Sequence, residues 1–408
     1  MIQRLIGLFA LGVLLSACAN LEEKPHPHQA YLTSLPEAEV KVDWYTRIAE
    51  YGIDRFSRLS PVVAGDSVYV ADKKGTVQRR SPDLGEPVWE SQWNLNFSAG
   101  PEVVQGQVLL GTQNADLLAL NAEDGKLIWR TKVSSEVITP PKRVADIVIV
   151  QTIDGRVVGL DAGNGKQVWT FSRQVPILTL RGNSPPLIVD DRVIIGLSSG
   201  KLVALSVADG KMLWESSVAI PRGRSELERV VDIDGMLLHD NGTLYVVSYQ
   251  GRIAAVTIES GRILWTRDMS SYFGLSMSER YLFVSDADGK LWALDKENGA
   301  TLWMQDKLQG LLNTTATIAG DRLVVGDIDG NLYWIMMADG GIASKYAHAS
   351  LAAAVGFYSV ADTEEEQAKY KKSAGYFDFG LVTAPQLAKN DFVVTYRSGI
   401  VAKLSLHQ

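Results

Sequence analysis

Side chains that commonly carry out chemistry are scarce in this chain. Of its five histidines, His26, His28 and His407 lie near the ends, which leaves His239 and His348 in the body of the protein. Neither belongs to a nucleophile–base motif, and there is no Gly-x-Ser-x-Gly elbow or His-Glu-x-x-His zinc motif. The single cysteine, Cys18, rules out an intramolecular disulfide, a cysteine-based zinc cluster and a thiol redox pair. We therefore assign no catalytic residue.

Two acidic pairs have spacing that could begin a calcium loop, Asp286-x-Asp288-Gly289 and Asp327-x-Asp329-Gly330. Neither is followed by a Glu at the closing position that an EF-hand requires. Both pairs stand where a hairpin turn is expected, and Asp and Gly favour such turns. The sequence therefore predicts turns here, with no metal site and no cofactor.

The composition is that of a folded protein that does not bind nucleic acid. The 408 residues include 40 Lys and Arg against 47 Asp and Glu, which gives a formal net charge of −7. That balance opposes binding to a phosphate backbone. With 46% hydrophobic and 21% charged residues, the chain can bury a core.

The amino terminus has the layout of a secretory signal, with Arg4, an apolar run at 5–15 and then Leu15-Ser16-Ala17-Cys18. The run is too short to span a bilayer permanently. The segment resembles a bacterial lipoprotein signal, in which the cysteine becomes the first mature residue, thioether-linked to diacylglycerol and N-acylated. An ordinary cleaved signal with a chance cysteine is the alternative.

We accordingly expect a signal peptide at residues 1–17, a lipidated Cys18 with a tether at 18–39, and a folded domain at 40–408. Several acyl chains on one residue would hold the protein firmly on a membrane. Ala19 and Asn20 follow the cysteine, whereas lipoproteins kept in the inner membrane usually carry Asp there. The resemblance therefore implies a lipid anchor in the outer membrane, facing the periplasm.

One motif recurs along the chain, as in Asp124-Gly125-Lys126-Leu127-Ile128-Trp129, preceded by apolar runs that alternate with turns as in β-hairpins. Aligned turns give eight copies, at Gly75, Ala115, Gly155, Gly200, Gly251, Gly289, Gly330 and Gly399. A tryptophan follows 14 residues later in six of them, at Trp89, Trp129, Trp169, Trp214, Trp265 and Trp303. Ser344 takes that place in the seventh copy, and the eighth ends before reaching it.

The strand missing from the eighth copy can come from residues 40–44, which end in Trp44. A blade built from both ends closes a ring and leaves no open sheet edge. We predict an all-β, eight-bladed β-propeller closed by pairing of the N- and C-terminal strands, rather than an open solenoid, which needs capping repeats. The repeated tryptophans are expected to pack between blades, each stabilising the ring by about 1.5–3 kcal/mol.

Two consecutive connections are longer than the others, 31 residues from Trp169 to Gly200 and 37 from Trp214 to Gly251, against 24–27 elsewhere. The first carries Leu178 and Leu180 beside Arg181, and the second is densely charged over 222–234. Apolar anchors beside Arg and acidic residues are typical of a protein–protein contact. The alternative is that the leucines pack on their own blade while the charges remain solvated.

A third irregularity is the 55-residue stretch from Ser344 to Gly399. Within it, residues 363–372 have acidic side chains first and basic ones last, which predicts a short surface helix. We assign no role to the insertion at 345–398.

The tryptophan repeat is similar to that of quinoprotein dehydrogenases, eight-bladed propellers that hold pyrroloquinoline quinone (PQQ) and Ca²⁺ on the ring axis. Those enzymes generally place an adjacent pair of cysteines against the quinone. This chain has no cysteine apart from Cys18, so a binding scaffold is the better hypothesis.

The whole chain resembles the BamB family of outer-membrane lipoproteins, subunits of the β-barrel assembly machinery. In that family a Leu-x-Leu-Arg-Gly loop and an Asp-x-Asp segment one blade later dock onto the periplasmic POTRA domains of the central barrel protein. The resemblance implies a non-catalytic scaffold without a cofactor, with POTRA domains, and also nascent outer-membrane proteins, as partners. A PQQ-type dehydrogenase and a periplasmic ligand-binding propeller are the alternatives. The matching positions here are Leu178, Leu180, Arg181, Asp232 and Asp234.

Overall fold

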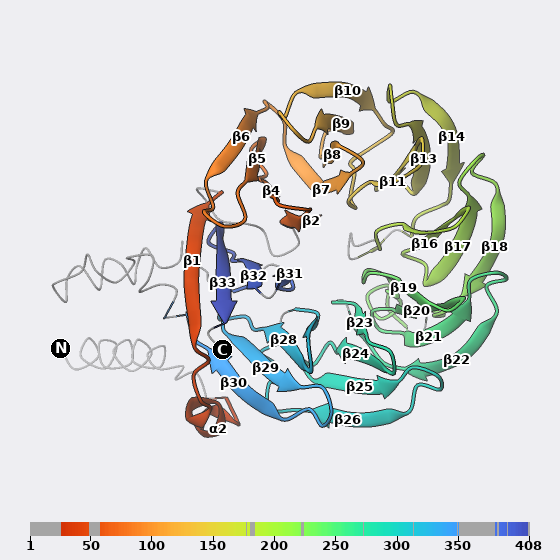
Figure 1. The fold of residues 1–408 in the computed structure, drawn as a ribbon. Helices are drawn as coiled ribbons and strands as arrows, with labels where there is room; N and C mark the ends of the chain where they lie inside the picture. Colours follow the sequence, from red (N-terminus) through yellow and green to blue (C-terminus); the bar gives the residue numbers. More distant parts are fainter. Residues whose placement is uncertain are drawn as a thin grey trace, which may run out of the picture. The chain divides into compact units, whose positions relative to one another are not determined.

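The computed structural model describes residues 26–48, 58–176, 178–179, 184–221, 224–271, 273–312, 314–348, 350, 380–381, 383–389 and 391–406. The chain divides into two units, Met1–Leu35 and Pro36–Gln408. In the first, the predicted tether contains one short helix, α2 (Gln29–Ser34). In the second, eight sheets follow one another around a ring, which confirms the predicted eight-bladed propeller (Figure 1).

Each blade has four antiparallel strands, and in blades 1 to 7 these four follow chain order from the ring axis outward. Blade 1 comprises β3 (Val62–Val63), β4 (Val68–Ala71), β5 (Thr76–Arg80) and β6 (Pro87–Gln92). Blade 2 comprises β7 (Phe97–Val104), β8 (Gln107–Thr112), β9 (Asp116–Asn121) and β10 (Leu127–Lys132), with β2 (Arg58–Leu59) added parallel to β7. Blade 3 comprises β11 (Lys142–Val144), β12 (Ile147–Gln151), β13 (Arg156–Asp161) and β14 (Gln167–Ser172). Blade 4 comprises β15 (Leu187–Val189), β16 (Arg192–Gly196), β17 (Lys201–Ser206) and β18 (Met212–Ser217).

The remaining blades repeat this order. Blade 5 comprises β19 (Leu238–Asp240), β20 (Thr243–Val247), β21 (Arg252–Thr257) and β22 (Ile263–Asp268). Blade 6 comprises β23 (Leu275–Met277), β24 (Tyr281–Ser285), β25 (Leu291–Asp295) and β26 (Thr301–Gln305). Blade 7 comprises β27 (Thr317–Ala319), β28 (Arg322–Gly326), β29 (Leu332–Met336) and β30 (Ile342–Tyr346). Blade 8 comprises β31 (Gln386–Ala388), β32 (Asp391–Thr395), β33 (Ile400–Leu406) and, from the other end of the chain, β1 (Val40–Arg47).

The closing blade joins the two ends of the ring as the sequence predicted. Strands β1 and β33 pair antiparallel from Val40 opposite Leu406 to Arg47 opposite Ile400 (Figure 1). Because β1 supplies the outer strand that the eighth copy lacks, the propeller has no unpaired end to template aggregation.

The middle strands of each blade form the core. β8, for example, is buried along its whole length, whereas the outer strand β10 buries little besides Trp129. Neighbouring blades cover the middle strands on both faces, so these strands are continuous apolar runs. Within the described residues, no helix is long and apolar enough to cross a membrane.

Seven tryptophans on outer strands each link their blade to the blade that follows it. Each indole Nε1 donates a hydrogen bond to a backbone carbonyl oxygen of the following blade, which satisfies the polar group of a largely buried ring. The bonds run from Trp44 to Pro82 (2.9 Å), Trp89 to Ala122 (3.0 Å), Trp129 to Ala162 (2.8 Å), Trp169 to Val207 (2.8 Å), Trp214 to Ile258 (2.8 Å), Trp265 to Lys296 (3.3 Å) and Trp303 to Met337 (2.9 Å).

A β-bulge directly before each tryptophan turns its ring toward the next blade. In β14, Trp169 pairs with Gly159 while Gln167 pairs with Leu160, so Val168 has no partner. Such a bulge changes the phase of the strand and redirects the side chains after it. Both Gln167 and Val168 therefore face solvent, and Trp169 faces the core.

Candidate partner-binding face

The two long connections lie next to each other, between blades 3 and 4 and between blades 4 and 5. The backbone N–H of Ser184, at the end of the first, donates to the carbonyl oxygen of Ile233, within the second, at 3.0 Å. The backbone N–H of Tyr249 donates to the carbonyl of Asp232 at 2.9 Å. These bonds join Ser184 of the first connection to residues 232–233 of the second, and join the second connection to the β20–β21 turn.

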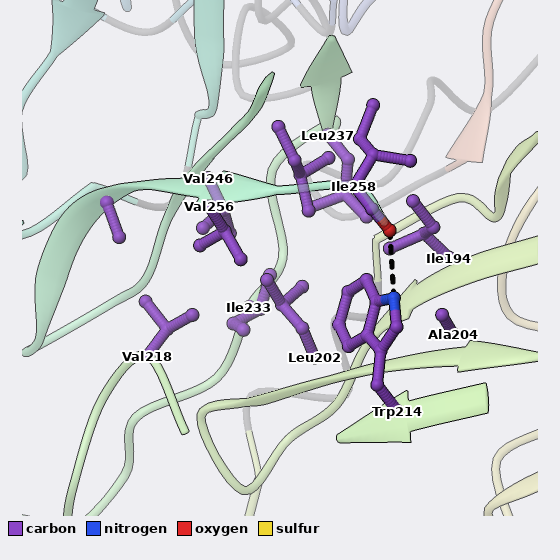
Figure 2. Close-up of a cluster of buried hydrophobic side chains, with 12 residues drawn as sticks. Ile194, Leu202, Ala204, Trp214, Val218, Ile233, Leu237, Val246, Val256 and Ile258 are labelled. Atoms are coloured by element: carbon purple, nitrogen blue, oxygen red, sulfur yellow. Dashed lines mark hydrogen bonds between the residues drawn. The ribbon is translucent and has the colours of Figure 1, made fainter. Parts of the chain in front are cut away.

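Ile233 fixes the second connection to the ring. Its side chain is fully buried, and Figure 2 shows it inside the apolar cluster with Trp214, Leu202 and Leu237. Its Cγ2 lies so close to Gly196 of β16 that even a Cβ there would collide with it. Val137 against Gly111 and Leu381 against Gly326 repeat this arrangement in other blades, so Ile233 belongs to the repeat.

Asp232 and Asp234 flank Ile233 and are buried, with 0% and 3% of their surfaces exposed. The sequence predicts a solvent-facing position for them, because the connection around them is densely charged. The structure instead places them between blades 4 and 5, because the Ile233 packing draws this part of the connection into the core. Buried carboxylates require hydrogen-bonding or charged neighbours.

Leu178 lies on the first connection and leaves 41% of its surface exposed. The other two positions of the same motif, Leu180 and Arg181, lie outside the described residues, as does Cys18. The segment leading to Leu178 borders a small hollow, open to solvent, between blades 3 and 4. The hollow is lined by Gln151, Gly155, Arg173, Gln174, Val175, Pro176, Leu197, Ser198 and Ser199.

Charged side chains brace this hollow. Glu215 accepts a hydrogen bond from Lys201 Nζ at 2.7 Å and one from Arg173 Nη2 at 3.0 Å. The Lys201 bond is the main reason that the pKa of Glu215 lies below its usual value. The Arg173 guanidinium also lies over the Phe171 ring, 5.2 Å from its centroid. The wall of the hollow is therefore held in place.

The second connection exposes apolar side chains that the sequence analysis did not single out. Ile220, Leu227 and Met236 have 60%, 66% and 57% of their surfaces exposed. The sequence does mark the turn that carries Leu227, because Ser225-x-x-Glu228 matches the capping-box pattern that fixes the start of a helical turn.

The acidic pairs noted in the sequence act as turn acceptors. Asp286 Oδ1 accepts the N–H groups of Asp288 and Lys290, and Asp327 Oδ1 accepts those of Asp329 and Asn331. Such side-chain-to-backbone bonds are the usual chemistry of Asp in a turn. Across the described ranges, no three His, Cys, Asp or Glu residues lie together as metal ligands would.

One of the two body histidines, His239, lies within the second connection, and the other, His348, lies in blade 7. His239 is exposed on β19. His348 follows β30, where burial lowers the pKa of its imidazole and its backbone N–H donates to Asn331 Oδ1 at 3.1 Å. Neither supplies a reason to place chemistry on this face.

Comparisons with known proteins identify the family. A family model described as outer membrane protein assembly factor BamB matches residues 73–305. The protein of that name from Pseudomonas aeruginosa is 39% identical over 339 residues, which cover 83% of this chain and 89% of the relative. The chain belongs to the BamB family. A BamB from Xanthomonas campestris is 36% identical over 366 residues, covering 85% of this chain and 90% of its own.

Two solved structures share this fold, one of a BamB and one of an enzyme, and they differ in how similar their sequences are to this chain. The crystal structure of BamB from Moraxella catarrhalis has a TM-score of 0.72 at 25% identity and covers 89% of this chain and all of its own. A quinohemoprotein alcohol dehydrogenase from Comamonas testosteroni has a TM-score of 0.66 at 12% identity, covering 91% of this chain and 77% of its own. That likeness shows a shared fold alone. BamB relatives are assembly factors, an accessory role, so the prediction of a non-catalytic protein is confirmed.

Proposed function

We propose that this BamB-family chain is a scaffold lipoprotein of the complex that assembles β-barrel proteins in the outer membrane. The relatives' name, outer membrane protein assembly factor, supports the process. The lipoprotein-like signal supports the location: residues 1–17 are removed, acylated Cys18 holds the protein on the outer membrane, and 18–39 tether a propeller at 40–408 that faces the periplasm.

The partner is the set of periplasmic POTRA domains of the central barrel protein, bound at the face formed by the two long connections. One observation carries this proposal: Leu178 leaves 41% of its surface exposed on the first connection, and Ser184 of that connection is hydrogen-bonded to Ile233 in the buried part of the second. An apolar side chain presented by a rigid support loses little conformational entropy on binding.

The five motif positions divide into two roles. Leu178 and Leu180 are the apolar anchors, and Arg181 pairs with an acid or backbone carbonyls of the partner. Asp232 and Asp234 are positioning residues, because their burial keeps them from a partner that approaches from solvent. They hold the connection in the shape that the partner recognises.

The mechanism requires no cofactor. A closed ring with a tryptophan contact between successive blades is a rigid body, and it orients the periplasmic arm that it binds. Nascent outer-membrane proteins are further partners to be considered, since an oriented arm can present them for insertion into the membrane.

The test is a mild-detergent pull-down of the tagged full-length lipoprotein from its own outer membrane. The wild-type chain is expected to retain a POTRA-containing barrel protein, and Leu178→Ala to retain about tenfold less. Leu84→Ala is the matched control, because Leu84 is exposed (68%) in the blade 1 turn, away from both connections. Recovery of the wild-type chain alone, or equal retention by both variants, would contradict the proposal.

A further inference from the structure

Near the middle of the second long connection, a hydrogen-bonded turn carries an exposed apolar side chain, Leu227. We propose that Leu227 is a second anchor for the same partner and inserts into an apolar pocket bordered by charges of both signs. This inference rests on the proposed function, because it assumes that a protein docks on this face. It adds a contact that the Leu-x-Leu-Arg-Gly and Asp-x-Asp motifs do not include.

Hydrogen bonds at both ends fix the turn that carries Leu227. Glu228 Oε2 accepts the backbone N–H groups of Arg224 at 2.6 Å and Ser225 at 3.2 Å. Ser225 Oγ accepts the N–H of Glu228 at 3.2 Å. This reciprocal pattern is a capping box, which holds one helical turn in place. Leu227 lies inside the box, so its position is set before any partner arrives.

Core residues follow this turn directly in the chain. Val230 and Val231, which follow it, are buried, as is Ile233. Leu227 by contrast has 66% of its surface exposed. An exposed leucine forgoes hydrophobic stabilisation within its own fold and recovers it only when another surface covers the side chain. Leu227 is thus an apolar side chain on a turn whose conformation is already fixed, and it is available to a partner.

The charges around the tip identify the kind of partner. The exposed side chains of Arg224, Glu226 and Arg229 carry both signs, and Arg229 Nη1 lies 3.5 Å from Glu226 Oε1. Binding to an anionic lipid surface or to nucleic acid needs an excess of positive charge. A mixed rim around an apolar centre is typical of a protein–protein interface.

Leu227 stands on the connection that is hydrogen-bonded to the one carrying Leu178. The Ser184–Ile233 bond joins the bases of the two connections, and exposed Ile220 and Met236 lie near the start and end of the second connection. A folded domain that covers Leu178 can therefore also reach the second connection. The occupant is the same partner, which contacts both connections at once.

Photo-crosslinking in cells tests the contact directly. A photoreactive residue replaces Leu227 in the full-length lipoprotein, with Leu178 and Leu84 replaced in parallel. The expected result is that positions 178 and 227 crosslink to the same protein and position 84 does not. Crosslinks from position 227 only to lipid, or only to a second copy of the chain, would overturn the proposal.

Binding variants separate this inference from the function on which it rests. Leu227→Ala is expected to reduce partner retention about 10- to 100-fold, with unchanged thermal unfolding, because the side chain is exposed in the free protein. Glu228→Ala, which keeps Leu227 but loosens its turn, is expected to give a smaller loss that Glu228→Gln restores. If Leu178→Ala abolishes retention and Leu227→Ala does not, the second anchor is wrong and the proposed function stands. If neither variant reduces retention, both proposals fall.

Discussion

Trp334 of β29 lies directly opposite Ser344 of β30, and this pair reverses the arrangement found in blades 2 to 6. In blades 2 to 6 the tryptophan is on the outer strand and a small residue is opposite it. The pairs are Trp129 with Ala119, Trp169 with Gly159, Trp214 with Ala204, Trp265 with Ala255 and Trp303 with Ala293. In blade 7 the tryptophan is on the third strand and the small residue is on the outer strand.

The exchange follows from how the ring closes. In blades 1 to 7 a glycine turn between the third and outer strands receives the tryptophan of the preceding blade, as Gly340 receives Trp303. The closing blade has no such turn, because its third and outer strands, β33 and β1, come from opposite ends of the chain. Trp334 instead packs edge-on against Phe392 of the closing blade, with ring centroids 6.2 Å apart.

Replacing Trp334 with Ala is expected to lower the free energy of unfolding by about 3–5 kcal/mol, because it empties a site that is almost fully buried. The exchanged double variant, Trp334→Ser with Ser344→Trp, restores the arrangement of blades 2 to 6 but has no glycine turn to receive the new ring. It is therefore expected to remain destabilised. Urea unfolding measures both, and a double variant as stable as wild type would contradict this account of closure.

The glycine turns can be tested with a matched pair. Gly165 has φ 71°, and a Cβ added there would collide with Thr131 Oγ1 and lie 2.7 Å from the Trp129 ring, whereas Gly242 has φ 76° with nothing within 4 Å. Both Ala variants suffer the same backbone strain. Gly165→Ala also forces the tryptophan contact apart, so we expect it to be more destabilising than Gly242→Ala by about 1–3 kcal/mol. Thermal unfolding compares them, and equal losses would show that the turn glycines serve φ alone.

Much of the ring could be predicted from the sequence because its repeat is marked by residues with few substitutes. The tryptophan and glycine positions gave the blades, and the missing outer strand of the last copy gave the closure through Trp44. The exchange of Trp334 and Ser344 could not be predicted, since it depends on which turn faces blade 7. In the fifth copy, positive φ falls at Gln250 rather than at the predicted turn residue Gly251, a shift that spacing cannot reveal.

The candidate face was located by counting residues between repeats, because a long connection is visible in the spacing. The count could not show which residues of a connection the neighbouring blades cover. Asp232 and Asp234 stand in a charged segment, yet the buried packing of Ile233 places them inside. Leu227 stands in the same segment and is outside. Burial of such residues depends on contacts between blades, which local composition does not encode.

Lys403 ties the closing strand into the ring, and its removal should weaken closure. Its Nζ lies 3.0 Å from Asp391 of the same blade, 3.6 Å from Asp43 of β1 and 3.9 Å from Asp83 of blade 1. Lys403→Met leaves these carboxylates without their shared cation, so we expect a loss of about 1–3 kcal/mol. Denaturant unfolding near pH 7 measures the loss. The control is Lys211→Met, which removes the lysine of a solvent-exposed ion pair with Asp209.

The same lysine predicts how stability changes at alkaline pH. Burial lowers the pKa of Lys403, but the hydrogen bond to Asp391 and the charges of Asp391, Asp43 and Asp83 outweigh burial, so its pKa is raised. The stabilisation is then complete below the unfolded pKa of about 10.4 and is lost as the pH rises through the higher folded value. Wild-type stability should fall faster than that of Lys403→Met above about pH 10.5. Parallel curves would show that the cluster does not act through charge.

Asp327 predicts that stability also falls with rising pH in mildly acidic solution. Burial raises the pKa of its carboxyl to about 6, although Asn331 and Tyr333 donate hydrogen bonds to it. Because the folded pKa lies above the unfolded value of about 3.9, the folded state binds the proton more tightly, and stability falls as the pH rises from about 4 to 6. The difference between the two pKa values corresponds to about 3 kcal/mol of destabilisation at pH 7.

Asp327→Asn removes this ionisation while keeping the shape of the turn. It is expected to flatten the pH dependence between pH 4 and 7, and to stabilise the protein at pH 7 relative to its effect at pH 4, where the wild-type carboxyl is already largely protonated. Asp286→Asn is the matched control, since Asp286 accepts the same pair of backbone bonds in blade 6 but is only half-buried. Urea unfolding at several pH values compares them. An unchanged slope in Asp327→Asn would show that the buried carboxyl does not govern stability in this range, and that the strongly hydrogen-bonded turn tolerates its charge.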